Sequence, residues 1–216
     1  MALSVQEFSR LYEQLAPDYD RRDRMFRLIG FREPSYKRKA IAALDLRLGD
    51  TVVDIGCGTG LNFAYLQNVV GPEGKIIGVD LTPGMLAQAK KRITQNDWKN
   101  VELIQSDAAD FIFPTGIDAV LSTFALTFVP GFETVIGNGF SALKSGGKFA
   151  VLDMKQPEGW PMWMVRLAVK SAAPFGVTLD LSQRRPWEVM RRYTKVVKYR
   201  AFYASFVYLA VGKKQE

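Results

Sequence analysis

The most informative absence in the sequence is histidine, because none of the 216 residues is one. Without it the chain cannot use a Ser-His-Asp triad, a histidine general base or a metal site with histidine ligands. Cysteine occurs once, at Cys57, so no disulfide can form within the chain and a reducing compartment is permitted. Proton transfer would therefore depend on carboxylates, tyrosines, lysines or water.

Long apolar runs are also absent. No uninterrupted run reaches the length of a transmembrane helix, and the first residues lack the basic start and apolar stretch of a secretion signal. We therefore expect a soluble cytoplasmic protein without a transmembrane segment, for which any contact with a membrane would be peripheral. The composition, 48% hydrophobic and 24% charged residues, is that of a globular protein, and the length fits one α/β domain.

The net charge is positive. Lysine and arginine number 29 against 22 aspartates and glutamates, which gives a formal charge of +7. Such a charge indicates an anionic partner, such as an acidic lipid, a nucleic acid or an anionic substrate, although a basic soluble protein without one fits equally well. Because no aromatic-basic single-strand motif or known RNA-binding signature is present, we expect no nucleic-acid partner.

A glycine-rich motif lies at residues 51–60, which read Thr-Val-Val-Asp-Ile-Gly-Cys-Gly-Thr-Gly. The β-branched start predicts a buried strand, and the glycines predict a tight turn in which the backbone approaches a ligand before a helix begins. A carboxylate at Asp54 would repel a dinucleotide pyrophosphate but attract a cationic ligand such as a sulfonium. The pattern therefore favours S-adenosylmethionine over NAD.

Asp54 to Gly60 resembles the first motif of class I S-adenosylmethionine-dependent methyltransferases. The resemblance implies an α/β, Rossmann-like fold: a seven-stranded, mostly parallel sheet with an antiparallel last strand, helices on both faces and an N-terminal helical lid. It also implies a single methyltransferase domain over residues 1–216, with the lid in 1–44, the cofactor-binding core in 45–153, and a substrate-side insertion and the closing strands in 154–216. S-adenosylmethionine is then the cofactor and S-adenosylhomocysteine the product.

Two further acids follow the next two predicted strands. Asp80 ends the apolar run at 75–80, and Asp107 comes shortly after the run at 101–105. The carboxyl ends of parallel strands meet at one edge of a sheet, where α/β folds bind their ligands. We therefore expect Asp54, Asp80 and Asp107 to converge on one site.

The two later acids suit different parts of the cofactor. Asp80 can accept both ribose hydroxyls, a bidentate task that fits a carboxylate. Its alternative role is a helix N-cap, but Thr82 can supply that cap itself. In the family, an acid at the position of Asp107 accepts from the adenine amine, and the next backbone amide, here that of Ala108, meets a ring nitrogen.

Residues 11–20, Leu-Tyr-Glu-Gln-Leu-Ala-Pro-Asp-Tyr-Asp, resemble a Tyr-rich signature that precedes the core of methyltransferases acting on quinones, phospholipid headgroups and other small molecules. In that group the segment folds over the cofactor as a lid, and the second tyrosine, here Tyr19, commonly lies against the methyl-donor pocket. The resemblance implies a catalytic role for Tyr19. The alternative is that Tyr12 and Tyr19 are ordinary helix residues that pack on the core.

Together the motifs and the resemblance predict these cofactor-binding residues: Tyr19, Asp54, Gly56, Cys57, Gly58, Gly60, Asp80, Leu81, Met85, Asp107, Ala108, Ser122 and Thr123. No metal site is expected. Residues 123–130 follow a predicted strand and are mostly apolar and aromatic. In similar enzymes this loop lines the acceptor side, which would suit an apolar or amphipathic acceptor, although core packing of Phe124 and Phe128 explains it equally well.

Basic and aromatic segments flank the predicted core. Arginines alternate with large apolar residues at 20–29, and tryptophans and methionines accompany basic residues at 160–170. Both segments could lie on an anionic membrane, or could be helices with one solvated face. A helix over 36–44 is predicted to expose Lys37 and its two basic neighbours.

Methyl transfer from a sulfonium is an in-line displacement, so the enzyme mainly aligns the acceptor and excludes water. A chain without histidine can do this. The leading hypothesis from the Tyr-rich signature and the basic flanks is a phospholipid-headgroup N-methyltransferase of the phosphatidylethanolamine type. The alternative is a methyltransferase for a quinone precursor or another soluble small molecule, and an RNA-directed enzyme has the least support. The lack of histidine favours a nitrogen or oxygen acceptor over carbon.

Overall fold

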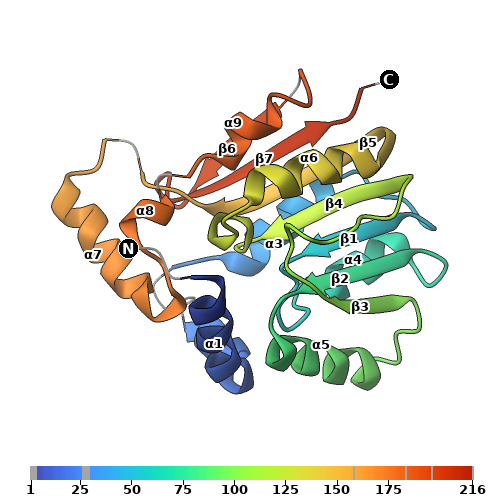
Figure 1. The fold of residues 1–216 in the computed structure, drawn as a ribbon, viewed down its shortest axis with the longest axis horizontal. Helices are drawn as coiled ribbons and strands as arrows, with labels where there is room; N and C mark the ends of the chain where they lie inside the picture. Colours follow the sequence, from blue (N-terminus) through green and yellow to red (C-terminus); the bar gives the residue numbers. More distant parts are fainter. Residues whose placement is uncertain (1–3, 26–29, 158, 183, 196, 216) are drawn as a thin grey trace.

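The computed structural model describes residues 4–25, 30–157, 159–182, 184–195 and 197–215. Within them one sheet runs in the order β3-β2-β1-β4-β5-β7-β6 (Figure 1). Its strands are β1 (Thr51–Ile55), β2 (Lys75–Asp80), β3 (Val101–Gln105), β4 (Ile117–Thr123), β5 (Leu143–Met154), β6 (Val197–Phe202) and β7 (Val207–Lys213). The strands β1 to β5 are parallel to one another, and β7 is antiparallel to both β5 and β6. The predicted seven-stranded sheet with an antiparallel last strand is confirmed.

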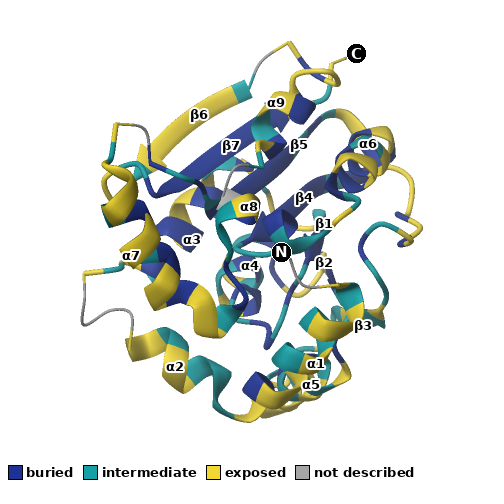
Figure 2. Ribbon diagram, turned by 60° about the vertical axis from the view of Figure 1, so that its left-hand side comes forward, coloured by how far each residue is buried: buried dark blue, intermediate teal, exposed yellow. Residues whose placement is uncertain are grey.

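Helices cover both faces of this sheet because successive strand residues point to opposite sides. Val53 and Ile55 of β1 pack with α6 (Phe132–Ala142) and α9 (Pro186–Met190). Val52 lies in the other core, to which α3 (Glu33–Ala43), α4 (Phe63–Val70) and α5 (Pro83–Gln95) contribute the buried residues Tyr36, Phe63, Leu66 and Ala89. The strand β7 is buried along most of its length, whereas β6 is mostly exposed at the edge (Figure 2).

A third group of helices lies beyond one end of the sheet (Figure 1). It contains α1 (Val5–Leu15), the 3-10 turn η1 (Ala16–Asp18), α2 (Tyr19–Met25), α7 (Met162–Ala172), η4 (Ala173–Phe175) and α8 (Leu179–Ser182). Ser4 and Glu7 form a capping box that fixes the start of α1. Leu15 and Ala16 pack against Met85 of α5, so the N-terminal segment is held against the core.

Several boundaries differ from the sequence-based expectation. The helix α3 begins at Glu33, because Pro34 lies in its first turn, where a missing N–H costs nothing. Lys37, expected on the exposed side, is buried. The strand β5 begins at Leu143, with an irregular register against β4. The arginine-rich stretch at 20–29 falls partly outside the described residues.

Candidate functional site

The glycine turn after β1 is anchored to the end of β2. The backbone N–H groups of Gly56 and Cys57 both donate to the Val79 carbonyl, at 2.8 and 3.0 Å. Gly56 and Gly58 have φ angles of +66° and +54°, which favour glycine. A Cβ on Gly58 would meet no protein atom within 4 Å, so the space beside this backbone is open. The turn can therefore receive a ligand closely.

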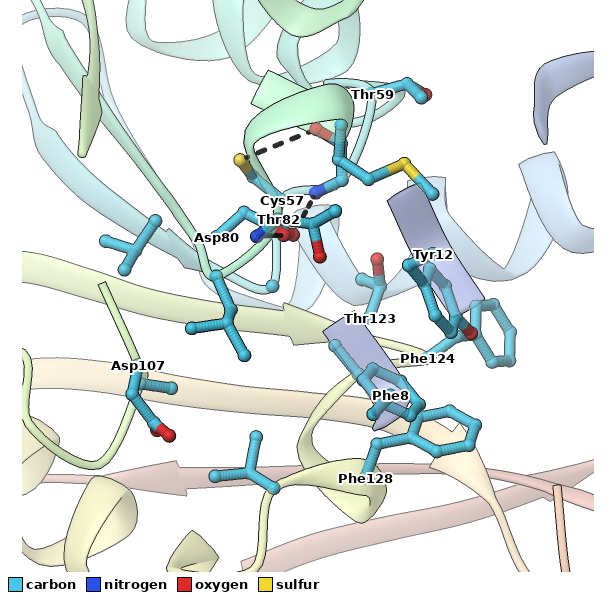
Figure 3. A pocket seen from close by; sticks show the side chains of 18 of the residues that line it. Phe8, Tyr12, Cys57, Thr59, Asp80, Thr82, Asp107, Thr123, Phe124 and Phe128 are labelled. Atoms are coloured by element: carbon cyan, nitrogen blue, oxygen red, sulfur yellow. Dashed lines mark hydrogen bonds between the residues drawn. The ribbon is translucent and has the colours of Figure 1, made fainter. Parts of the chain in front are cut away.

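Asp80 joins this turn to the start of α5. One carboxylate oxygen accepts from the Gly58 N–H at 2.8 Å, and the other accepts from the Thr82 N–H at 2.9 Å (Figure 3). Thr82 is the N-cap residue of α5, as expected, but its side chain makes no capping hydrogen bond. Burial raises the pKa of Asp80. Because a carboxylate oxygen has more than one lone pair, each can also accept from a ligand hydroxyl.

A cavity, here called the donor cavity, opens above the turn. Most of the predicted cofactor residues line it, namely Tyr19, Gly56, Cys57, Gly58, Asp80, Leu81, Met85, Asp107, Ala108 and Thr123. Asp107 lies apart from Asp80 along this wall (Figure 3), and its carboxylate accepts from the Ala109 N–H at 2.9 Å. Two of the three predicted acids therefore reach one cavity from neighbouring strands.

Asp54, Gly60 and Ser122 are not among the residues that line the donor cavity. Both oxygens of the fully buried Asp54 carboxylate accept from the Asn62 amide, at 3.1 and 3.0 Å. Burial raises the pKa of Asp54 to about 7, opposed by this hydrogen bond. The expectation that Asp54 faces a ligand directly is therefore corrected: it holds Asn62, which does line the cavity and donates to Thr123 at 3.0 Å.

The other two residues have packing roles. A Cβ on Gly60 would lie 2.6 Å from the Phe63 ring, so glycine is needed there for the approach of α4. The Ser122 side chain is buried in β4, and its hydroxyl makes no hydrogen bond to the described residues.

The N-terminal helices supply an aromatic wall, of which only Tyr19 is among the predicted site residues. Phe8 stacks on Tyr12 with ring centroids 4.4 Å apart and contacts Phe128 at 4.8 Å (Figure 3). The Tyr12 hydroxyl donates to the Phe175 carbonyl at 3.2 Å, and its ring lies 6.0 Å from that of Tyr19. Phe8 was missed, although its spacing of four residues from Tyr12 on an amphipathic helix was a usable signal.

Polar contacts hold this wall against the glycine turn. Asp20 of α2 accepts from the Thr59 hydroxyl at 2.6 Å and forms an ion pair with Arg92 of α5. Glu13 of α1 accepts from the Gly84 N–H at 2.8 Å, at the start of α5. The N-terminal segment is therefore held against the glycine turn and the start of α5, and Phe8, Tyr12 and Tyr19 from it line the donor cavity.

A second cavity, here called the acceptor cavity, shares a wall with the first. The residues common to both are Tyr12, Tyr19, Lys37, Thr123, Phe124 and Phe128. Beyond them the acceptor cavity is mainly apolar and aromatic, with Met154, Trp160, Phe175 and Phe206 among its lining residues. A ligand in the acceptor cavity would therefore lie next to a ligand in the donor cavity, at the residues that line both.

Tyr19 lies on the shared wall, where burial raises its pKa well above the usual value. A tyrosine with a raised pKa is a poor base near neutral pH but can still donate a hydrogen bond. In the described part of the chain, no group of three or more potential metal ligands is found, and no helix is long and apolar enough to cross a membrane.

Solved methyltransferases share this architecture. A chain from the complex between the Trm112 methyltransferase activator of Haloferax volcanii and a methyltransferase superposes with a TM-score of 0.72 at 18% identity, covering 95% of this chain and 98% of that one. A phosphoethanolamine N-methyltransferase of Haemonchus contortus, solved with S-adenosylhomocysteine, gives 0.64 at 16% identity over 79% of this chain and 50% of that one. The fold is that of a class I S-adenosylmethionine-dependent methyltransferase.

The chain belongs to the ubiE/COQ5 methyltransferase family, whose model matches residues 1–169. A demethylmenaquinone methyltransferase of Listeria monocytogenes serotype 4a (strain HCC23) is 32% identical over 155 residues, which cover 70% of this chain and 64% of that relative. The chain thus matches slightly less than two thirds of the length of such relatives. The resemblance inferred from the glycine motif and the Tyr-rich segment is confirmed at the level of the family.

Proposed function

We propose that the chain transfers a methyl group from S-adenosylmethionine to a ring carbon of a reduced quinone precursor. The observation that carries this proposal is the pair of adjoining cavities: one beside the glycine turn and Asp80, the other lined by aromatic and aliphatic side chains. A hydroxylated aromatic ring fits the second by stacking and burial. Membership of the ubiE/COQ5 family supports the same acceptor class.

The donor cavity has the groups that the cofactor requires. Asp80 would accept the ribose hydroxyls with its remaining lone pairs, and Asp107 with the Ala108 N–H would meet the adenine. The open backbone beside Gly58 leaves room for the close approach of the ligand. Bound there, S-adenosylmethionine supplies an electrophilic methyl carbon with a neutral thioether as leaving group.

The chain's own contribution would be alignment and exclusion of water. Phe8, Tyr12 and Phe128 pack together over the donor cavity, and Tyr19 lies where the two cavities meet. Holding acceptor and methyl carbon in line within a dry site accounts for much of the acceleration in such a displacement. In this proposal Tyr19 orients the acceptor by donating a hydrogen bond.

A phospholipid headgroup amine, the leading hypothesis from the sequence, becomes the second candidate. Asp23 and Glu33 line the acceptor cavity, and carboxylates beside aromatic rings suit an ammonium group. The headgroup phosphate has less to bind. Among the described residues that line this cavity the one cation is Lys37, which forms an ion pair with Glu33. Because the cavity offers little to bind the phosphate, the quinone-type acceptor stays the first candidate. Membership of the ubiE/COQ5 family supports the same choice.

The test is transfer of labelled methyl from S-adenosylmethionine to three acceptors in parallel: 1,4-dihydroxynaphthalene kept reduced under argon, phosphatidylethanolamine vesicles, and total RNA. We expect label on a ring carbon of the dihydroxynaphthalene, located by mass spectrometry, and none in the others. Label confined to the ethanolamine lipid would replace the first candidate with the second. Asp110→Ala, at an exposed aspartate, is a control that should retain activity.

We further propose that α7 contacts an anionic membrane. Met162, Trp163 and Leu167 are 48%, 67% and 63% exposed, with Arg166 and Lys170 on the same helix. Figure 2 shows that much of the surface of α7 is exposed. Apolar and basic residues together favour the interface of an anionic bilayer. The opposite side of α7 contributes Ala168 and Ala172 to the acceptor cavity, so such contact would bring the cavity beside the lipid.

Liposome flotation tests this contact. We expect the wild-type chain to float with vesicles that contain anionic lipid and to be released by high salt, because surface charge attraction is screened. The double variant Trp163→Ser/Leu167→Ser should lose flotation, whereas Ile112→Ser, at an apolar residue that is 89% exposed elsewhere, should not. Equal flotation of all three proteins would refute the role of α7.

A further inference from the structure

A buried ion pair lies on α3, between Glu33 and Lys37. Their side chains are 4% and 9% exposed, and their spacing of four residues places them on the same face of the helix. Such residues are rarely buried unless they are paired, and here each is the other's partner. The pair therefore needs an explanation beyond a solvated helix face.

The pair lies where the two cavities meet. Lys37 lines both, and Glu33 lines the acceptor cavity. One carboxylate oxygen of Glu33, although ion-paired, has no hydrogen-bond partner among the described residues. This is the oxygen that pairs with the Lys37 ammonium, and because a carboxylate oxygen has more than one lone pair it can also accept from a ligand hydroxyl.

Stability does not account for the pair. Removing two charges from water costs several kcal/mol per ion, and replacing a buried pair with apolar side chains is often neutral or stabilising. Glu33 in the first turn of α3 does complement the helix dipole, but an exposed acid would serve that purpose as well and would not require a buried lysine. The position of the pair beside both cavities indicates a role in the reaction instead.

Other titratable groups surround the pair. The charges of Asp23 and Glu33 act on Tyr19 of α2. The charge of Lys37 acts on Asp54 of β1. Burial raises the pKa of Tyr12 and of Tyr19, which disfavours either as a base. Asp54 does not line either cavity. The sequence contains no histidine, and the carboxylates that line the acceptor cavity are those of Asp23 and Glu33.

We propose that Glu33 accepts the proton of the acceptor's ring hydroxyl and that Lys37 holds the resulting oxyanion. This rests on the proposed function, because it names the groups that would activate a hydroxylated ring. Both side chains line the acceptor cavity and are paired with each other. The group that accepts the proton would therefore lie next to the group that stabilises the negative charge. Asp23, also on the acceptor cavity, is the competing base that the experiment must separate.

The step balances without a redox partner. The hydroxyl proton passes to Glu33, the electron pair of the oxyanion is delocalised onto the neighbouring ring carbon, and this carbon bonds to the methyl of S-adenosylmethionine as the carbon–sulfur bond breaks toward sulfur. Glu33 returns its proton to the ring oxygen and, as a carboxylate again, accepts the proton that the ring carbon loses, which it then passes to solvent. One proton is released in net, and the sulfonium becomes a neutral thioether.

Two readouts test the pair in the full chain. The first is methylation of 1,4-dihydroxynaphthalene as a function of pH. We expect Glu33→Gln to lower kcat about 100- to 10,000-fold and to remove the acid limb of the kcat profile, since a positioned base contributes that much. Affinity for S-adenosylhomocysteine should stay unchanged. Asp23→Asn should keep the acid limb, and Lys39→Met, at an exposed lysine on the same helix, should behave as wild type.

The second readout is binding of 1-naphthol with S-adenosylhomocysteine present, followed by absorbance, because the phenol and phenolate forms differ in spectrum. Wild type should bind it partly as phenolate near neutral pH, and Lys37→Met should bind it as phenol only. The double variant Glu33→Leu/Lys37→Met, which carries no unpaired charge, should fold at least as well as wild type and be inactive. If either single variant unfolds, this double variant can still be assayed in the folded state.

The outcomes separate the two proposals. Wild type that binds no naphthol and methylates no dihydroxynaphthalene would overturn the proposed acceptor class. Wild type that methylates it, with variants of Glu33 and Lys37 that keep kcat, the pH profile and the phenolate spectrum, would overturn the role of the pair alone. If Asp23→Asn removes the acid limb of the kcat profile and Glu33→Gln keeps it, the base is Asp23 instead.

Discussion

Replacing Asp80 with alanine should weaken binding of S-adenosylhomocysteine about 10- to 150-fold. The estimate follows from about 1.5 to 3 kcal/mol for a hydrogen bond to a charged group, at about 1.4 kcal/mol for each tenfold change. The loss has two sources. The carboxylate would no longer accept from ribose hydroxyls, and the N–H groups of Gly58 and Thr82 would lose their acceptor, so the glycine turn would be less well fixed.

Isothermal titration calorimetry measures this affinity directly, with thermal unfolding as the check on folding. Asp110→Ala, at an exposed aspartate, is the matched control and should bind as wild type. Asp107→Ala should lose less than Asp80→Ala, because its carboxylate accepts from one N–H, that of Ala109, among the described residues. Wild-type affinity in a folded Asp80→Ala protein would remove this residue from the cofactor site.

The parts of the fold with strong local signals could be predicted. The strands β2 and β3 occur at 75–80 and 101–105 as expected, because apolar and β-branched runs between turn residues specify buried strands largely by themselves. Helix ends were less predictable. The predicted helix at 36–44 begins after Pro34 and so leaves Glu33 outside it. Proline is favoured in the first turn of a helix, and α3 does begin at Glu33.

That boundary also concealed the ion pair. With the helix starting later, Lys37 had no partner four residues before it and was grouped with Arg38 and Lys39 as a solvated face. Lys37 lines the same two cavities as Tyr19 and Thr123, which are far from it in the sequence, and no local pattern contains this arrangement. The packing of Phe8 against Phe128 could not be predicted for the same reason.

The convergence of acids was partly predictable. Parallel strands place Asp80 and Asp107 at one edge, and both line the donor cavity. Asp54 obeys the same topology, but its side chain turns into the core, where Asn62 satisfies it. The glycine motif specifies the path of the backbone, whereas the direction of this carboxylate depends on a partner eight residues away on the following turn.

Gly56→Ala should destabilise the protein by about 2 to 5 kcal/mol. A Cβ there would lie 2.2 Å from the Ala125 Cβ, closer than two carbon atoms can approach, and relief of such overpacking typically costs about 1 to 3 kcal/mol. The φ of +66° adds about 1 to 2 kcal/mol of backbone strain for a residue with a side chain. Urea unfolding, analysed at constant m-value, measures the sum.

The two contributions can be separated because the clash has one partner. In Gly56→Ala/Ala125→Gly the clashing Cβ is moved rather than added, so the double variant should recover about 1 to 3 kcal/mol of the loss and keep the strain. Gly116→Ala measures strain alone, since Gly116 has a φ of +75° and no atom within 4 Å of a built Cβ. Because Gly56 and Ala125 both line the donor cavity, restored stability should bring restored affinity for S-adenosylhomocysteine. A double variant no more stable than Gly56→Ala would show that the turn is limited by its backbone conformation and not by its contact with the loop after β4.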